Sequence, residues 1–286
     1  MVTRWRVVLV SQFPQGMLAL DAAVRDAGHT AVAVFAARGK GLHPREPFNA
    51  VLSELIHTIP VGLPVVFPGG PEQIASLLDP FEPDLLLCYG FPWRIPADAL
   101  AVPRLGGVNV HPSLLPRYRG PTPIAWAIRN ADPEVGLSLH RMDADFDTGP
   151  LLAQGRVPLD DDDSIATLQP KLAALLEELL PHALECVAAG DPGVSQEDGD
   201  GVWAGSFGDD YVWIDPGRTT REVHAQVRAW RFPMPPVPLR GALLELDGRT
   251  VRVLGTSLRR IDGPRIECAD GPLWIVESEP VEPPAT

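Results

Sequence analysis

Short, continuously apolar runs recur along the first 110 residues, and segments with helical periodicity separate them. Runs without polar alternation are typical of strands that are buried on both faces, as in parallel sheets. Strands that alternate with helices favour the same arrangement, because each crossover helix covers a face of the sheet. We therefore predict an α/β fold with a Rossmann-like, mostly parallel sheet. Its predicted strands lie at residues 6–10, 30–35, 64–67, 84–89 and 107–110, with helices at 17–27 and 72–78.

The composition changes after a long helical stretch at residues 164–189, which Gly190 ends. Residues 191–210 are rich in Asp, Gly, Glu and Ser, which is typical of a linker. Beyond it, a predicted helix at 219–230 precedes short strands joined by two Asp-Gly turns, and this pattern indicates a small antiparallel β domain resembling an OB barrel. The predicted domains are a catalytic domain at 1–190, a linker at 191–210 and a small C-terminal OB-like domain at 211–286.

Charge and cysteine content exclude several classes of function. The formal net charge of −13 disfavours a large non-specific nucleic-acid surface, which needs clustered Lys and Arg. The three cysteines are far apart and show no CxxC spacing, so we expect no disulfide framework and no metal site. No signal peptide is visible and no apolar stretch approaches the ~20 residues of a membrane span. We therefore expect a cytoplasmic protein without a membrane partner; the sequence does not determine its oligomeric state.

The first loop after a predicted strand carries no nucleotide-binding motif. Its sequence SQFPQG (residues 11–16) has one glycine and no G-x-G-x-x-G pattern, and no Walker lysine loop occurs in the chain. Ligands of open α/β sheets bind at the carboxyl ends of strands. Asn109 and His111 lie at such an end, and their separation by two places both side chains on the same side of the strand.

An Asn and a His on one side of a strand end suit a reaction that develops an oxyanion. Acyl or formyl transfer to an amine needs hydrogen-bond donors for that oxygen and a group that removes the amine proton. An Asp near the His would keep it protonated or relay protons through water. Taken as two isolated residues, however, Asn109 and His111 are more simply read as local turn chemistry.

A longer motif surrounds these two residues. NVHPSLLPRYRG (residues 109–120) is followed by PIAWAI (123–128), GLSLHRMD (136–143) and FDTGP (146–150). This ordered series is similar to that of the folate-dependent formyltransferases, which include enzymes acting on methionyl-tRNA, nucleotide sugars and glycinamide ribonucleotide, and formyl-folate hydrolases. The resemblance implies the formyltransferase fold, 10-formyltetrahydrofolate as co-substrate, and catalytic positions at Asn109, His111 and Asp147.

The resemblance also implies binding residues. The folate-binding positions are Tyr89, Gly90, Phe91, Ile95, Met142, Asp143 and Asp145. The acceptor-binding positions are Ser113, Tyr118 and Arg119, although Tyr118 and Arg119 are equally compatible with a solvated loop. We expect Trp126 and Ile128 to lie in the core of a helix and His140 to be a structural histidine. We interpret residues 160–163 as a solvated turn before a helix. The sequence leaves the isomer of the Leu115–Pro116 bond open.

Members of this family differ in the amine that they formylate. We predict a formyltransferase acting on a small-molecule amine, such as an amino-sugar nucleotide or a biosynthetic intermediate. The acidic chain, the short last domain and the SQFP turn favour it. The alternative is a methionyl-tRNA formyltransferase with tRNA as partner, because the domain plan and residues 37–41 resemble that enzyme. Further alternatives are a formyltetrahydrofolate hydrolase, a non-catalytic folate-binding protein, and a nucleic-acid module. The last rests on arginines of the C-terminal domain, at positions 240, 249, 252, 259, 260 and 265.

Overall fold

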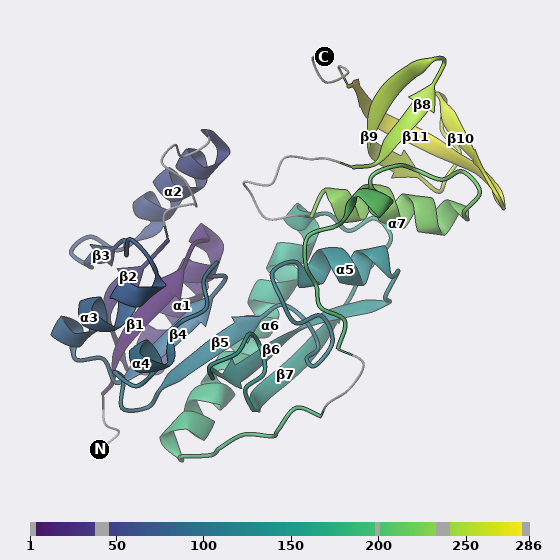
Figure 1. Ribbon diagram of the computed structural model, residues 1–286. Coiled ribbons are helices and arrows are strands. Elements are labelled where there is room, and N and C mark those ends of the chain that lie inside the picture. Colours follow the sequence, from purple (N-terminus) through teal and green to yellow (C-terminus); the bar gives the residue numbers. More distant parts are fainter. Residues whose placement is uncertain (1–3, 38–45, 198–200, 233–240, 282–286) are drawn as a thin grey trace. The chain divides into compact units, whose positions relative to one another are not determined.

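The computed structural model describes residues 4–37, 46–197, 201–232 and 241–281 (Figure 1). The chain divides into two compact units, and each is assembled from three stretches of sequence. The first unit comprises 1–120, 136–157 and 169–203, and the second comprises 121–135, 158–168 and 204–286. The fold prediction is confirmed: the chain forms a mostly parallel sheet and a separate antiparallel C-terminal sheet. The predicted domain boundaries stay a prediction.

A seven-stranded sheet forms the centre of the first unit. Its order is β3-β2-β1-β4-β5-β6-β7, and the five strands from β3 to β5 pair in parallel. β6 lies antiparallel to β5. The strands are β1 (Arg6–Ser11), β2 (Thr30–Phe35), β3 (Val65–Val66), β4 (Leu85–Tyr89), β5 (Gly107–His111), β6 (Glu134–Arg141) and β7 (Leu151–Pro158).

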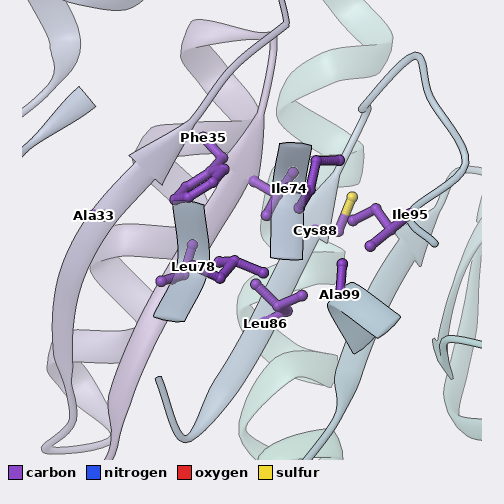
Figure 2. Packing of buried hydrophobic residues seen from close by; sticks show 10 residues of the cluster. Ala33, Phe35, Ile74, Leu78, Leu86, Cys88, Ile95 and Ala99 are labelled. Carbon is purple, nitrogen blue, oxygen red and sulfur yellow. The ribbon is translucent and has the colours of Figure 1, made fainter. Parts of the chain in front are cut away.

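Helices cover both faces of the parallel half, because right-handed crossovers run outward from β1 in two directions. α1 (Pro14–Asp26) joins β1 to β2 and buries Met17, Leu20 and Val24. On the opposite face, α3 (Ile74–Leu78) and α4 (Ala97–Leu100) pack on alternate residues of β1, β2 and β4. Figure 2 shows this cluster, in which Cys88 of β4 lies against Ile95. Burial raises the pKa of the Cys88 thiol to about 12.

The β6–β7 half of the sheet depends on glycines at two close approaches. A Cβ at Gly136 would lie 2.2 Å from the carbonyl oxygen of Gly155 in β7. A Cβ at Gly155 would lie 2.7 Å from Leu175 of α6 (Ile165–Ala188), so this helix packs directly on the strand backbone. At Gly136 the neighbour is strand backbone, so only a residue without a side chain allows this approach, whereas at Gly155 the neighbour is the end of a leucine side chain.

The second unit joins helices α5 (Pro123–Arg129) and α7 (Thr220–Trp230) to a small antiparallel sheet. Thr219 and Glu222 form a capping box at the start of α7. The sheet order is β10-β11-β9-β8, with β8 (Leu243–Leu246), β9 (Arg249–Ser257), β10 (Arg265–Cys268) and β11 (Gly271–Pro280). Asp247 and Gly248 both have positive φ, as a tight hairpin requires. Of the two expected core positions in α5, Ile128 is buried, whereas Trp126 is half-buried and packs on Phe207.

Several elements differ from the sequence-based prediction. α2 (Glu46–Thr58) is absent from it, although Leu52, Leu55 and Ile56 have helical spacing. The helix expected at 72–78 is a 3-10 turn, η1 (Pro71–Gln73), that continues into α3. The predicted linker contributes an isolated bridge from Val194 to Leu151 and a 3-10 turn, η3 (Asp209–Tyr211). Residues 38–41, 233–238 and Arg240 lie outside the described residues.

No helix in the described part of the chain is long and apolar enough to cross a membrane. The Leu115–Pro116 peptide bond, which the sequence leaves open, is cis.

We expect Gly136→Ala to lower the free energy of unfolding by about 2–3 kcal/mol, because the added Cβ would collide with strand backbone. Urea denaturation measures the change. Gly255→Ala is the matched control: Gly255 also lies in a strand, but its added Cβ would meet nothing closer than 3.5 Å. An equal decrease in the free energy of unfolding of the two variants would contradict the steric explanation.

Candidate active site

β5 presents the two candidate polar residues at its carboxyl end. Asn109 is half-buried and His111 is buried, and both lie on one side of the strand. The antiparallel register places Asn109 opposite His140 of β6 and His111 opposite Ser138. This register is the reason that His140 meets Asn109, because directly opposed residues of a pair have neighbouring side chains.

Asp147 brings the third candidate group to the same place. It lies in the loop between β6 and β7 with a φ of 56°, a conformation that Asp tolerates better than most residues. One carboxylate oxygen, Oδ2, accepts a hydrogen bond from the Gly120 N–H at 2.9 Å. The other, Oδ1, accepts from Asn109 Nδ2 at 3.2 Å and lies 3.5 Å from His111 Nδ1. The structure therefore groups Asn109, His111 and Asp147.

The tautomer of His111 follows from its partners. Its Nε2 lies 2.8 Å from the Tyr118 carbonyl oxygen, which only accepts, so Nε2 carries the hydrogen. Nδ1 then faces Asp147. Burial lowers the pKa of His111, and the negative charge of Asp147 opposes that shift without reversing it. His111 is thus neutral at pH 7, with a free lone pair on Nδ1.

The pKa of Asp147 is shifted in the direction of ionisation. Burial alone would raise this pKa, but the neighbouring His140 and His111 and the Gly120 N–H hold it below the ordinary value. A negative carboxylate beside a neutral imidazole gives the pair one place for an incoming proton, at His111 Nδ1. Protonation there would replace a repulsive contact with an imidazolium–carboxylate pair.

His140 is more than the structural histidine expected from the sequence. Its Nδ1 lies 2.8 Å from the Arg141 carbonyl oxygen, so in the neutral ring Nδ1 donates and Nε2 accepts. Nε2 lies 3.2 Å from Asn109 Nδ2 and 3.6 Å from Asp147 Oδ1. The Asn109 amide nitrogen therefore points at two acceptors, which fixes the orientation of the amide. This role follows from the register in which β6 pairs with β5. The pattern of residues within one strand does not reveal that register.

The loop after β5 is held by a buried hydroxyl. Ser138 Oγ accepts from the Leu115 N–H and from Gln154 Nε2, at 3.1 and 2.8 Å, and donates to the Ser113 carbonyl oxygen at 2.7 Å. Every hydrogen-bonding capacity of the hydroxyl is used. The loop thereby returns to the strand end, and the carbonyl oxygen of Tyr118 meets His111.

Part of the proposed folate-binding set converges on one apolar cluster. Ile95 is only 2% exposed and belongs to the core, while Phe91 and Met142 are partly buried and pack against it. Phe91 contacts Trp93 edge to face, with ring centroids 5.6 Å apart. Phe91 and Ile95 follow β4 and Met142 follows β6, so the structure brings both predicted loops together.

The other proposed folate-binding residues have different surroundings. Tyr89 packs against α1, since a Cβ at Gly16 would lie 3.0 Å from its ring. Gly90 has a φ of 69° and lies beneath the Phe13 ring. Asp143 accepts from the Thr148 hydroxyl at 2.7 Å, and Asp145 lies 3.6 Å from Arg94 at the surface. Arg94 is a charged neighbour of this loop that the sequence-based prediction does not include.

The proposed acceptor-binding residues are unequally accessible. The Ser113 hydroxyl is buried and donates to the Arg117 carbonyl oxygen at 2.7 Å. Tyr118 is also buried, with a φ of 58°, and its ring lies under the Arg117 guanidinium. Arg119 donates from Nε and Nη2 to Gln196 Oε1, at 3.1 and 2.8 Å. Of the three side chains, only that of Arg119 carries a charge for recognition.

Residues 68–184 match the model of a family described as formyl transferase. The chain is 38% identical to methionyl-tRNA formyltransferase of Halorhodospira halophila over 64% of its own length, but it spans only 56% of that enzyme. It is 34% identical to the methionyl-tRNA formyltransferase of Myxococcus xanthus, covering 77% of this chain and 73% of the relative.

The protein therefore belongs to the folate-dependent formyltransferase family, as its motif predicted. Within that family, the curated relatives described above carry the name methionyl-tRNA formyltransferase.

Solved structures share the fold at lower identity. HypX from Aquifex aeolicus in complex with tetrahydrofolic acid has a TM-score of 0.68 and 17% identity, covering 98% of this chain and 45% of HypX. A sugar N-formyltransferase from Shewanella has a TM-score of 0.64 and 19% identity, covering 90% of this chain and 99% of that one. The two-sheet architecture is thus that of known formyltransferase structures.

We expect Asp147→Asn to lower the pKa of His111 further, because the carboxylate charge is the largest influence that raises it. An NMR pH titration of the ring resonances measures this pKa in both proteins. A pKa that stays constant or rises on substitution would contradict the assigned contact between the two side chains.

The stability of the wild type should fall as the pH decreases through about 6.5. Burial lowers the pKa values of His29, His111 and His224 below the ordinary histidine value of 6.5. Below that value the unfolded chain binds protons that the folded chain does not, so protonation favours unfolding. Urea denaturation between pH 5 and pH 8 tests this; a free energy of unfolding that rises toward acid would contradict it.

Proposed function

We propose that the protein transfers the formyl group of 10-formyltetrahydrofolate to a primary amine, with Asn109, His111 and Asp147 as the reacting set. The observation that carries the proposal is the grouping of these three side chains around one buried carboxylate. Asp147 Oδ1 lies 3.2 Å from the Asn109 amide nitrogen and 3.5 Å from His111 Nδ1. A neutral imidazole beside an ionised, buried carboxylate is the arrangement that suits a general base.

Formyl transfer places two demands on these residues, because negative charge grows on the formyl oxygen and the amine must lose a proton. Asn109 Nδ2 is the donor for the oxygen. Its present contacts of 3.2 Å are longer than the usual ~2.9 Å, so a better acceptor can take one of its N–H groups. His111 Nδ1 accepts the amine proton as the new carbon–nitrogen bond forms, and Asp147 stabilises the imidazolium that results. The imidazolium would return this proton to the folate nitrogen, which takes the electron pair of the broken carbon–nitrogen bond and leaves as tetrahydrofolate.

The residues proposed to bind folate fit a flat ring with polar edges. Phe91 and Met142 offer apolar contacts, and with Trp93 they pack on the cluster to which the buried Ile95 belongs. Asp143 and Asp145 supply carboxylates in the loop that ends at Asp147, while Tyr89 and Gly90 shape the end of β4. When bound, the folate supplies an activated formyl group, and these residues would hold it beside Asn109.

The acceptor best supported by the comparisons is the amine of initiator methionyl-tRNA. The curated relatives carry that name at 34–38% identity, which favours tRNA over the small-molecule amine predicted first from the sequence. The small amine remains a second candidate, because the Shewanella sugar N-formyltransferase is matched over 99% of its length and the chain has a net charge of −13. Arg119 is the proposed acceptor-binding cation in both cases. A cytoplasmic location belongs to the same proposal.

The remaining alternatives have less support. A hydrolase would use the same three residues with water as acceptor. A non-catalytic folate-binding protein leaves the His111–Asp147 pair without a purpose. A nucleic-acid module on the C-terminal sheet is weakened because Arg252 pairs with Glu279 and Arg265 with Glu267, so both arginines are neutralised within the chain.

The protein is incubated with 10-formyltetrahydrofolate and, in separate reactions, initiator methionyl-tRNA, amino-sugar nucleotides or no acceptor. We expect formylation of an amine, with tRNA the preferred acceptor. Asn109→Ala should lower kcat by about 10²-fold or more. Mass spectrometry identifies the formylated product, and the release of tetrahydrofolate measures the rate.

His57→Ala serves as a control for His111→Ala, because His57 is exposed at the end of α2 and its hydrogen bond is to the Ser53 carbonyl oxygen of the same helix. Full activity in both His111→Ala and Asp147→Asn would overturn the proposed chemistry. Formylation of sugar nucleotides but not of tRNA would move the assignment to the small-amine class. Release of tetrahydrofolate at the same rate without an acceptor would identify a hydrolase.

A further inference from the structure

The segment that follows α6 runs beside the Asp147 loop. The backbones of Val194 and Leu151 exchange two hydrogen bonds of 2.8 Å, which fixes the segment against the start of β7. Further along, Trp203 forms a backbone bridge with Arg119. Gln196 follows the first of these anchors and is half-buried, and its side chain faces the proposed active-site loops.

The Gln196 carboxamide uses all of its hydrogen-bonding capacity. Nε2 donates to the carbonyl oxygens of Asp147 and Gly149, at 2.9 and 2.8 Å. Oε1 accepts from Nε and Nη2 of Arg119, at 3.1 and 2.8 Å. Carbonyl groups only accept and a guanidinium only donates, so the orientation of the amide is fixed by its partners.

The Asp147 loop needs such support. Asp147 has a φ of 56°, a left-handed conformation that persists only where the surroundings enforce it. Gly149 is pressed against β6, since a Cβ there would lie 1.8 Å from the Arg141 carbonyl oxygen. Gln196 binds the backbone on both sides of Thr148 and thereby fixes the direction in which the Asp147 carboxylate points.

Gln196 also acts from the other side of the same carboxylate. Arg119, which it binds, precedes Gly120, whose N–H donates to Asp147 Oδ2 at 2.9 Å. One amide therefore connects the backbone that carries Asp147 with the loop that hydrogen-bonds to its carboxylate. It also sets the position of the one charged side chain among the proposed acceptor-binding residues.

We propose that Gln196 is a positioning residue for formyl transfer: its amide nitrogen aligns the Asp147 carboxylate with His111, and its amide oxygen orients Arg119 toward an anionic acceptor. This inference rests on the proposed function and adds to it a residue outside the formyltransferase motif. The two halves of the amide serve different steps, so they can be separated by substitution.

Three variants separate the two halves. Gln196→Glu keeps an acceptor for Arg119 but has no N–H for the carbonyl oxygens of Asp147 and Gly149, so kcat should fall about 10- to 100-fold. Arg119→Ala removes the charge proposed to bind the acceptor and the partner of the Gln196 amide oxygen, but leaves both N–H groups of Gln196 on the Asp147 loop, so KM for the acceptor should rise by a larger factor than kcat falls. Met is similar in length to Gln, but Gln196→Met loses both sets of hydrogen bonds. The value of kcat should therefore fall and KM for the acceptor should rise.

Rates are measured with 10-formyltetrahydrofolate and either initiator methionyl-tRNA or an amino-sugar nucleotide, whichever the wild type formylates. A second readout needs no turnover. If Gln196→Met lets Asp147 move away, the pKa of His111 should fall, because the charge of Asp147 is what raises it. NMR titration of the His111 ring detects this shift in a protein whose folding is checked by its thermal transition.

Gln226→Met is the matched control. Gln226 likewise donates from Nε2 to two backbone carbonyl oxygens, those of Tyr211 and Trp213, at 2.8 and 2.9 Å, but it lies in the second unit. Loss of these two hydrogen bonds in Gln226→Met should lower the free energy of unfolding and leave the His111 pKa and kcat unchanged.

An unchanged His111 pKa together with wild-type kcat in both Gln196 variants would overturn the inference. If the wild type formylates no amine and releases no tetrahydrofolate, the proposed function fails. The titration then still shows whether Gln196 positions Asp147.

Discussion

The buried carboxylate of Asp147 is the group on which the candidate site depends. It receives an N–H from Gly120, contacts the Asn109 amide and faces His111, so β5, the loop after it and the loop that carries Asp147 meet at two oxygen atoms. An uncompensated buried charge would be costly, and these donors make ionisation favourable. The same donors fix the loop between β6 and β7 and the loop after β5. Loss of this one charge would therefore disturb both the geometry and the proton affinity of the neighbouring imidazole.

Local patterns in the sequence were sufficient for most of the fold. Continuous apolar runs identified the parallel strands, and the first of them, at residues 6–10, is β1 with one added residue. The turn at Asp247–Gly248 was predictable because its conformation needs residues that tolerate positive φ. The antiparallel direction of β6 relative to β5 was not predictable in this way, because the direction of a strand depends on the connections between strands and not on its composition.

The motif located the candidate site, but tertiary contacts determine the roles of the remaining residues. His140 reads as an ordinary strand histidine until the register places it opposite Asn109. Gln196 lies in a stretch whose composition indicates a linker, and nothing within the chain's local pattern links it to Asp147, 49 positions away. Ser113 is the opposite case: it belongs to the motif, but its hydroxyl donates its hydrogen bond to the Arg117 carbonyl oxygen.

A buried cysteine lies beside the candidate site, and its reactivity depends on its ionisation. Cys88 is paired in register with Asn109, one strand away, and is 3% exposed. Only the thiolate form of cysteine reacts readily with alkylating agents and peroxides. With a pKa of about 12, the thiolate fraction of Cys88 at pH 7 is about one part in 10⁵. A sulfur atom thus lies next to the proposed reacting groups without making them vulnerable to oxidative stress or to thiol-directed inhibitors.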